Sequence, residues 1–164
     1  MALALTLLSL FTLVGLALST FSGWTLAHGA TGSIAHHIVL AVPTVLFSLF
    51  TQSMILFFFI GTGKLLKEAA AKRDDAARTY ILSRVRDFKR QTSALATFAP
   101  LSALAAGLLG ASAHTGKTPG WLHLVAVIGA ILLHLVAFFR EVVAMAETNK
   151  LMDEAATVVP PVPG

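Results

Sequence analysis

The first 63 residues of the chain contain no Asp, Glu, Lys or Arg. A soluble domain could not cover its surface with so long an uncharged stretch, whereas a membrane-spanning helix needs about 20 apolar residues. The stretch has room for two spans. In the whole chain 12% of the 164 residues are charged and 56% are hydrophobic, while soluble domains average about 25% charged residues. The sequence therefore predicts an integral membrane protein.

Four apolar segments have the length of membrane spans. The first is not preceded by basic residues and is longer than the apolar part of a signal peptide, so we interpret it as a retained span. We predict an all-α, polytopic membrane protein: one domain at 1–157 forming a four-transmembrane-helix bundle, followed by a Pro-rich extended tail at 158–164. The predicted spans are residues 2–27, 35–60, 93–112 and 121–143.

Charge is concentrated between the second and third spans. Nine of the twelve basic residues lie from Lys64 to Arg90. The i,i+4 spacing of Lys64 and Glu68 is typical of a helix, so both spans are predicted to continue out of the membrane as an amphipathic helical hairpin that turns near residues 73–75. Such a basic segment fits anionic lipid headgroups better than nucleic acid.

The same charges predict the orientation in the membrane. All basic residues except Lys117 lie in the hairpin, or at and beyond the end of the fourth span. Because cytoplasmic loops carry an excess of Lys and Arg, we expect the hairpin and both termini to face the cytoplasm. The predicted location is the inner (cytoplasmic) membrane.

Histidines gather at the opposite, outer boundary. The pair best placed to share a ligand is His36 or His37 with His123, because each lies close to the start of its span and the second and fourth spans run parallel. His28 and His114 lie near the same boundary and are possible additional metal ligands.

Three interpretations of these histidines remain open. Interfacial histidines can be amphipathic residues at the headgroup level that bind nothing. Two imidazoles from different helices can hold a b-type haem, and neutral imidazole is the commonest metal ligand, for copper or zinc as well. A copper or zinc site would have no acidic ligand on this side, and a haem would have only Lys117 near its propionates.

His134 lies deeper, 11 residues after His123, which is about 16 Å along a helix. A second haem at that depth would need a histidine from the second span, where Phe47 and Ser48 stand instead. We predict that His134 forms a structural hydrogen-bonded pair with Gln52 inside the bundle, because a polar side chain in hydrocarbon needs a partner.

No other motif indicates catalysis. Gly61-Thr-Gly-Lys64 lacks the first glycine and the final hydroxyl of a phosphate loop, and the chain has no cysteine. No acidic residue falls in the middle of a span, which argues against an ion pump. The sequence gives no catalytic constellation.

Two functions fit these features. The first is a non-catalytic accessory or anchor subunit of a larger membrane complex, respiratory or photosynthetic, because small-residue pairs such as Ala106 with Gly110 favour close helix packing. The alternative is a b-type haem or metal-binding electron-transfer protein that uses the outer histidines. The architecture is similar to that of membrane anchor and b-type cytochrome subunits, which is an analogy of fold and not of function.

Overall fold

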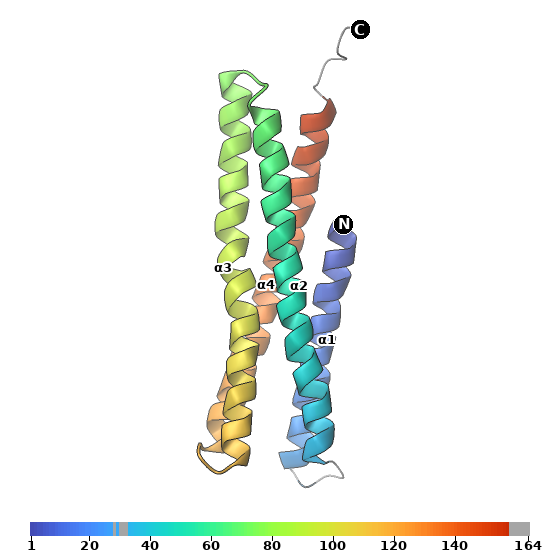
Figure 1. Ribbon diagram of the computed structural model, residues 1–164, viewed down its shortest axis with the longest axis vertical. Helices are drawn as coiled ribbons and strands as arrows, with labels where there is room; N and C mark the ends of the chain where they lie inside the picture. The colour runs from blue at the N-terminus through green and yellow to red at the C-terminus, as the bar shows by residue number, and fades with distance from the viewer. Residues whose placement is uncertain (28, 30–32, 158–164) are drawn as a thin grey trace.

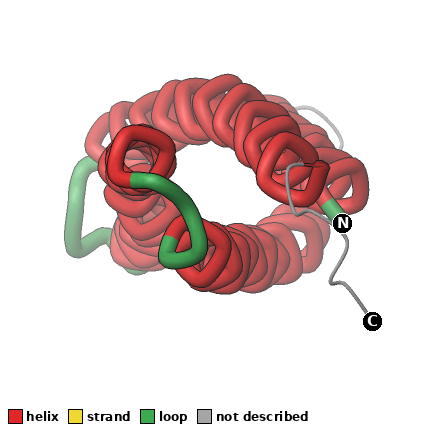
Figure 2. The backbone as a smooth tube through the Cα atoms, turned by 90° about the horizontal axis from the view of Figure 1, so that it is seen from above, coloured by secondary structure: helices red, strands yellow, loops and turns green. Residues whose placement is uncertain are grey.

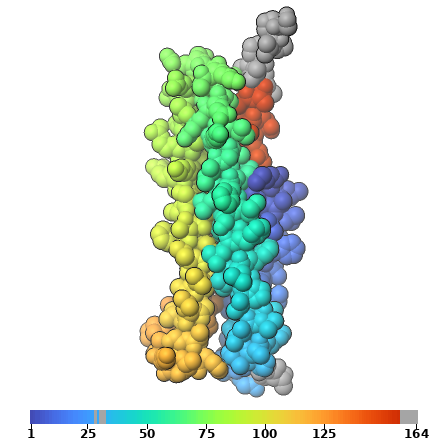
Figure 3. Space-filling model, viewed as in Figure 1, coloured from blue at the N-terminus to red at the C-terminus, as the bar shows by residue number. Residues whose placement is uncertain are grey.

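The protein is a bundle of four long helices in the computed structural model, which describes residues 1–27, 29 and 33–157. The helices lie side by side along one long axis (Figures 1 and 3) and around a common centre (Figure 2). All four are long and apolar enough to cross a membrane, so the predicted all-α, four-helix fold is confirmed. They are α1 (Ala2–Ala27), α2 (Ile34–Ala70), α3 (Asp75–His114) and α4 (Gly120–Thr157).

The helices differ in length. α1 has 26 residues, or about 39 Å at 1.5 Å per residue, which suits a single span. The other three have 37, 40 and 38 residues and continue past the N-terminus of α1 (Figure 1). We call the end formed by this extension the charged end. The opposite end, with the α1–α2 and α3–α4 turns, we call the histidine end.

The extension at the charged end has a core of its own. Leu66 of α2, Phe88 of α3 and Leu151 of α4 belong to one buried cluster there. α3 begins at the N-cap Asp74, whose carboxylate accepts a hydrogen bond from the Ala77 amide at 2.8 Å. The hairpin of α2 and α3 thus packs against α4, and these three helices form the charged end.

The outer surface of the bundle is apolar. Large side chains such as Phe11, Phe57 and Phe139 are more than half exposed. Alanines such as Ala99 of α3 and Ala137 of α4 are fully buried, which lets these two helices approach closely. An apolar outer surface is the reverse of that of a soluble bundle and fits a lipid environment.

Candidate functional site

His37 of α2 and His123 of α4 face each other at the histidine end. Their ring centroids lie 6.4 Å apart with an interplanar angle of 76°. The two helices run in the same direction, and α2 and α3 diverge toward this end (Figure 1). The two rings therefore meet between the α1–α2 hairpin and the α3–α4 hairpin.

Each ring is held by the first helix of its own hairpin. The Nδ1 atom of His37 lies 3.1 Å from the carbonyl oxygen of Ser19 in α1. The Nδ1 atom of His123 lies 2.9 Å from the carbonyl oxygen of Ala106 in α3. A carbonyl oxygen can only accept, so Nδ1 must carry the proton in both rings. Each Nε2 atom is then left with a free lone pair.

A glycine makes room for each ring. A Cβ atom added to Gly23 would lie 2.9 Å from Cε1 of His37, and one added to Gly110 would lie 2.8 Å from Cε1 of His123. Contacts below 3 Å do not occur for real side chains, so any other residue would displace the imidazole. Gly23 follows Ser19 by four residues, and Gly110 follows Ala106 by four. In both hairpins, therefore, the imidazole contacts a backbone carbonyl and a glycine four residues later on the preceding helix.

The separation of the two rings can be compared with metal coordination. A metal–imidazole bond is about 2.0–2.1 Å long and the ring centre lies roughly 1.1 Å beyond the nitrogen, so two ligands on opposite sides of a metal have centres about 6.3 Å apart. Two ligands of a tetrahedral metal would have centres about 5 Å apart. The observed centroid separation of 6.4 Å is close to the first value, in an edge-on arrangement of the two rings. Hydrogen bonds from the second ring nitrogen to backbone carbonyls are also what orient metal-bound histidines.

The remaining outer histidines do not join this pair. His36 and His114 are exposed, and the amide of His36 is bound to the N-cap side chain of Ser33 at 3.2 Å. His28 lies outside the described residues. Within those residues no group of three or more His, Cys, Asp or Glu side chains could hold a metal ion, whereas a structural zinc site needs four ligands.

The deep histidine has a different partner from the one predicted. His134 Nε2 lies 2.8 Å from Oγ of Ser48, and its Nδ1 lies 2.8 Å from the carbonyl oxygen of Ala130. Gln52 instead donates from Nε2 to Oε2 of Glu141 at 3.3 Å. The expected Gln52–His134 hydrogen bond is therefore wrong. The cause is the register of the parallel helices, in which Ser48 is level with His134, just as His37 is level with His123.

The Ser48–His134 pair could suggest a nucleophile and its base. Both side chains are fully buried in the bundle, and both ring nitrogens of His134 already have partners. No substrate can reach the serine, so we interpret the contact as structural.

Glu141 was not expected in the core. The sequence places it beside Arg140 at the end of the fourth span, yet its exposed fraction is 0%. The expectation that the bundle holds no buried acid is therefore wrong. A signal was present in the sequence: His134, Glu141 and Thr148 recur every seven residues, as positions on one face of a packed helix do, and all three are buried.

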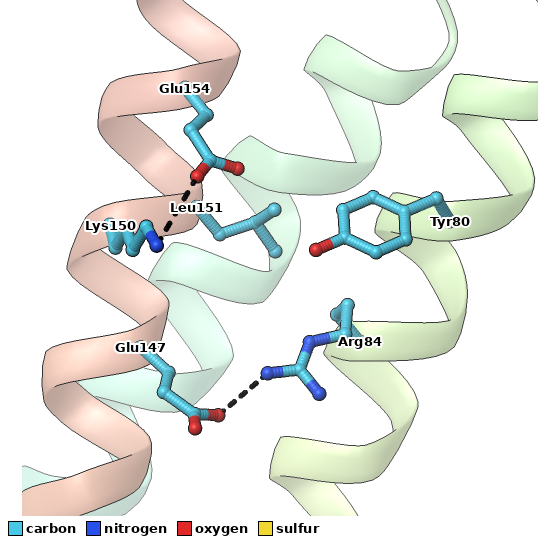
Figure 4. A pocket seen from close by; sticks show the side chains of 6 residues that line it. All are labelled: Tyr80, Arg84, Glu147, Lys150, Leu151 and Glu154. Atoms are coloured by element: carbon cyan, nitrogen blue, oxygen red, sulfur yellow. Dashed lines mark hydrogen bonds and ion pairs between the residues drawn. The ribbon is translucent and has the colours of Figure 1, made fainter.

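The charged end carries a shallow groove of about 150 Å³ between α3 and α4 (Figure 4). Arg84 Nη2 lies 2.7 Å from Glu147 Oε2, and Lys150 lies 4.0 Å from Glu154. Because each cation is next to an acid, the groove offers little net charge to a ligand. It is lined by Tyr80, Arg84, Glu147, Lys150, Leu151 and Glu154.

Comparison of the chain with protein-family models, with curated proteins and with solved structures finds no match. The functional argument accordingly depends on the geometry of the chain itself.

Proposed function

We propose that the protein is a small b-type cytochrome of the membrane, in which His37 and His123 would hold one haem. The observation that carries the proposal is the pair of imidazoles at 6.4 Å, each with Nδ1 fixed by a backbone carbonyl and Nε2 unengaged. A six-coordinate haem b supplies one-electron transfer when bound.

The residues around the pair suit this group. Gly23 and Gly110 leave the space that the two rings occupy, and the rings belong to different hairpins. Copper or zinc is the weaker candidate, because the separation of the rings matches opposed ligands and the described chain offers no third ligand nearby. Of the two neighbouring histidines, His37 is favoured over His36 because His36 is exposed.

The proposal combines both functions that the sequence suggests. An electron carrier without a catalytic group works by exchanging electrons with partner proteins, so we place the chain as an anchor and electron-transfer subunit of a larger membrane complex. The exposed aromatic side chains of α2, including Phe50 and Phe57, are available to lipid or to such partners.

The basic residues from Lys64 to Arg90 orient the protein. They lie around the charged end, which we propose to face the cytoplasm of a cell whose inner membrane holds the protein. Anionic headgroups are the expected partners of these side chains. The haem is then held near the outer boundary of the bilayer.

The test is the absorption spectrum and metal content of the protein purified in detergent from haem-producing cells. We expect a Soret band, sharp visible bands on reduction, and one iron per chain. His37→Ala and His123→Ala should each lose the haem, whereas His36→Ala and His114→Ala, the matched controls, should keep it. A colourless wild-type protein, or haem retained in both of the first two variants, would overturn the proposal.

A further inference from the structure

A buried polar layer lies in the bundle between α1, α2 and α4. It is one helical turn, toward the histidine end, from an apolar cluster whose members include Leu5, Ile55 and Met145. Each helix contributes one buried polar residue: Gln52 and Glu141 are hydrogen-bonded to each other, and Ser9 is buried one turn from Leu5. The exposed fractions of Ser9, Gln52 and Glu141 are 4%, 4% and 0%, so water has no direct access to any of them.

Every member of this layer has an oxygen atom without a hydrogen-bond partner. The atoms are Oγ of Ser9, Oε1 of Gln52 and Oε1 of Glu141. Among the described residues only Thr118 Oγ1, in the turn before α4, shares this property. Buried polar atoms are almost always paired. The oxygens of Gln52 and of an ionised Glu141 can only accept, so two unpaired acceptors on bonded side chains indicate a missing hydrogen.

The surroundings supply no cation for an ionised Glu141. α1 has no charged side chain, and the first charge of α2 is Lys64, three turns beyond Gln52. Arg140, next to Glu141 in sequence, is exposed. An isolated carboxylate in such a place is strongly disfavoured.

The neighbouring side chains of α3 and of α4 also supply no cation to Glu141. On α3, Phe88 and Thr92 are buried, and the charged Lys89 and Arg90 between them are exposed. On α4 itself, His134 lies two turns away with both ring nitrogens engaged.

We propose that Glu141 is a proton-binding site inside the bundle, with Gln52 as its hydrogen-bonding partner. A proton on Oε1 turns this atom into a donor for Oε1 of Gln52, while Gln52 Nε2 donates back to Oε2 of Glu141. One proton thus supplies the missing donor of this pair.

A buried carboxyl that binds a proton is a component of proton-linked membrane proteins. This site is independent of the haem proposal, because it depends on a different layer of the bundle. Glu141 and His123 are 18 residues apart on α4, or about 27 Å.

Infrared spectroscopy of the purified protein tests the site. At neutral pH we expect the carbonyl stretch of a protonated carboxylic acid, shifted in heavy water and absent in Glu141→Gln. The matched control is Glu147→Gln, which alters an exposed glutamate of the same helix and should keep the band. Gln52→Leu should move the band to higher frequency, because the carboxyl loses a hydrogen-bond donor.

Three results would overturn the proposal: no such band in the wild type, a band unchanged in Glu141→Gln, or loss of the band when sodium replaces N-methylglucamine at constant pH. The last would identify a sodium site. Should Glu141→Gln fail to assemble, Glu141→Asp decides the matter, since a band from this residue must change frequency when its side chain is shortened.

Discussion

The Oγ atom of Ser48 lies 2.8 Å from Nε2 of His134, at the depth where a second pair of haem ligands would require a histidine on α2. His37 and Ser48 are 11 residues apart, as are His123 and His134. The two levels of the bundle therefore have the same register but different chemistry. At the outer level Nε2 of both imidazoles has no partner among the described residues, whereas at the inner level Nε2 of His134 is hydrogen-bonded to Ser48.

Ser48→Ala should destabilise the protein, because it leaves Nε2 of His134 buried without a partner. The expected loss is about 1–3 kcal/mol, measured as a lower unfolding midpoint in one detergent. Ser53→Ala is the control. Its hydroxyl is exposed and bonded to Leu49 of its own helix, so its midpoint should stay close to the wild-type value. Equal shifts in the two variants would show that the contact with His134 contributes nothing.

Gly110→Ala should reduce haem occupancy by displacing the ring of His123. The new Cβ atom would lie 2.8 Å from Cε1 of that ring, and overpacking of this kind costs about 1–3 kcal/mol. Gly107→Ala, three residues away on the same helix, would meet no atom within 4 Å and should bind haem normally. The ratio of haem to protein absorbance gives the comparison. Equal occupancy in both variants would contradict the placement of His123.

The orientation of the two imidazoles predicts the electron paramagnetic resonance of the oxidised protein. The ring planes are 76° apart. Imidazoles that kept this angle on a haem iron would leave two iron orbitals almost equal in energy. We expect a strongly anisotropic low-spin signal with one very large g value. A rhombic signal with three moderate g values would indicate parallel rings, and a high-spin signal would indicate the loss of one ligand.

Hydrophobicity and charge were sufficient to predict the four helices. The uncharged first 63 residues and the Gly-rich turns define α1 and the start of α2, and each predicted span lies within one helix. The parallel direction of the second and fourth spans also followed, because spans separated by one other span run in the same direction. This is why His123 could be matched with a histidine of α2 before the structure was known.

Rotation and register could not be predicted in the same way. His36 and His37 differ by about 100° around the helix. His37 is the one that contacts α1, at Gly23 and at the carbonyl of Ser19. The partner of His134 depends on the relative height of two helices, which no local pattern encodes. Glu141 was missed because an acid beside Arg140 at the end of an apolar segment is typical of a water boundary.

The matching arrangement of the two hairpins has a consequence for the biogenesis of the protein. Each hairpin already contains what it needs to orient its own imidazole: the carbonyl of Ser19 and Gly23 for His37, and the carbonyl of Ala106 and Gly110 for His123. Each hairpin could thus insert into the membrane with its histidine already oriented, but with only one of the two histidines it would bind no haem. We expect the proposed haem site to form only when the two halves meet, so that haem binding would report complete assembly.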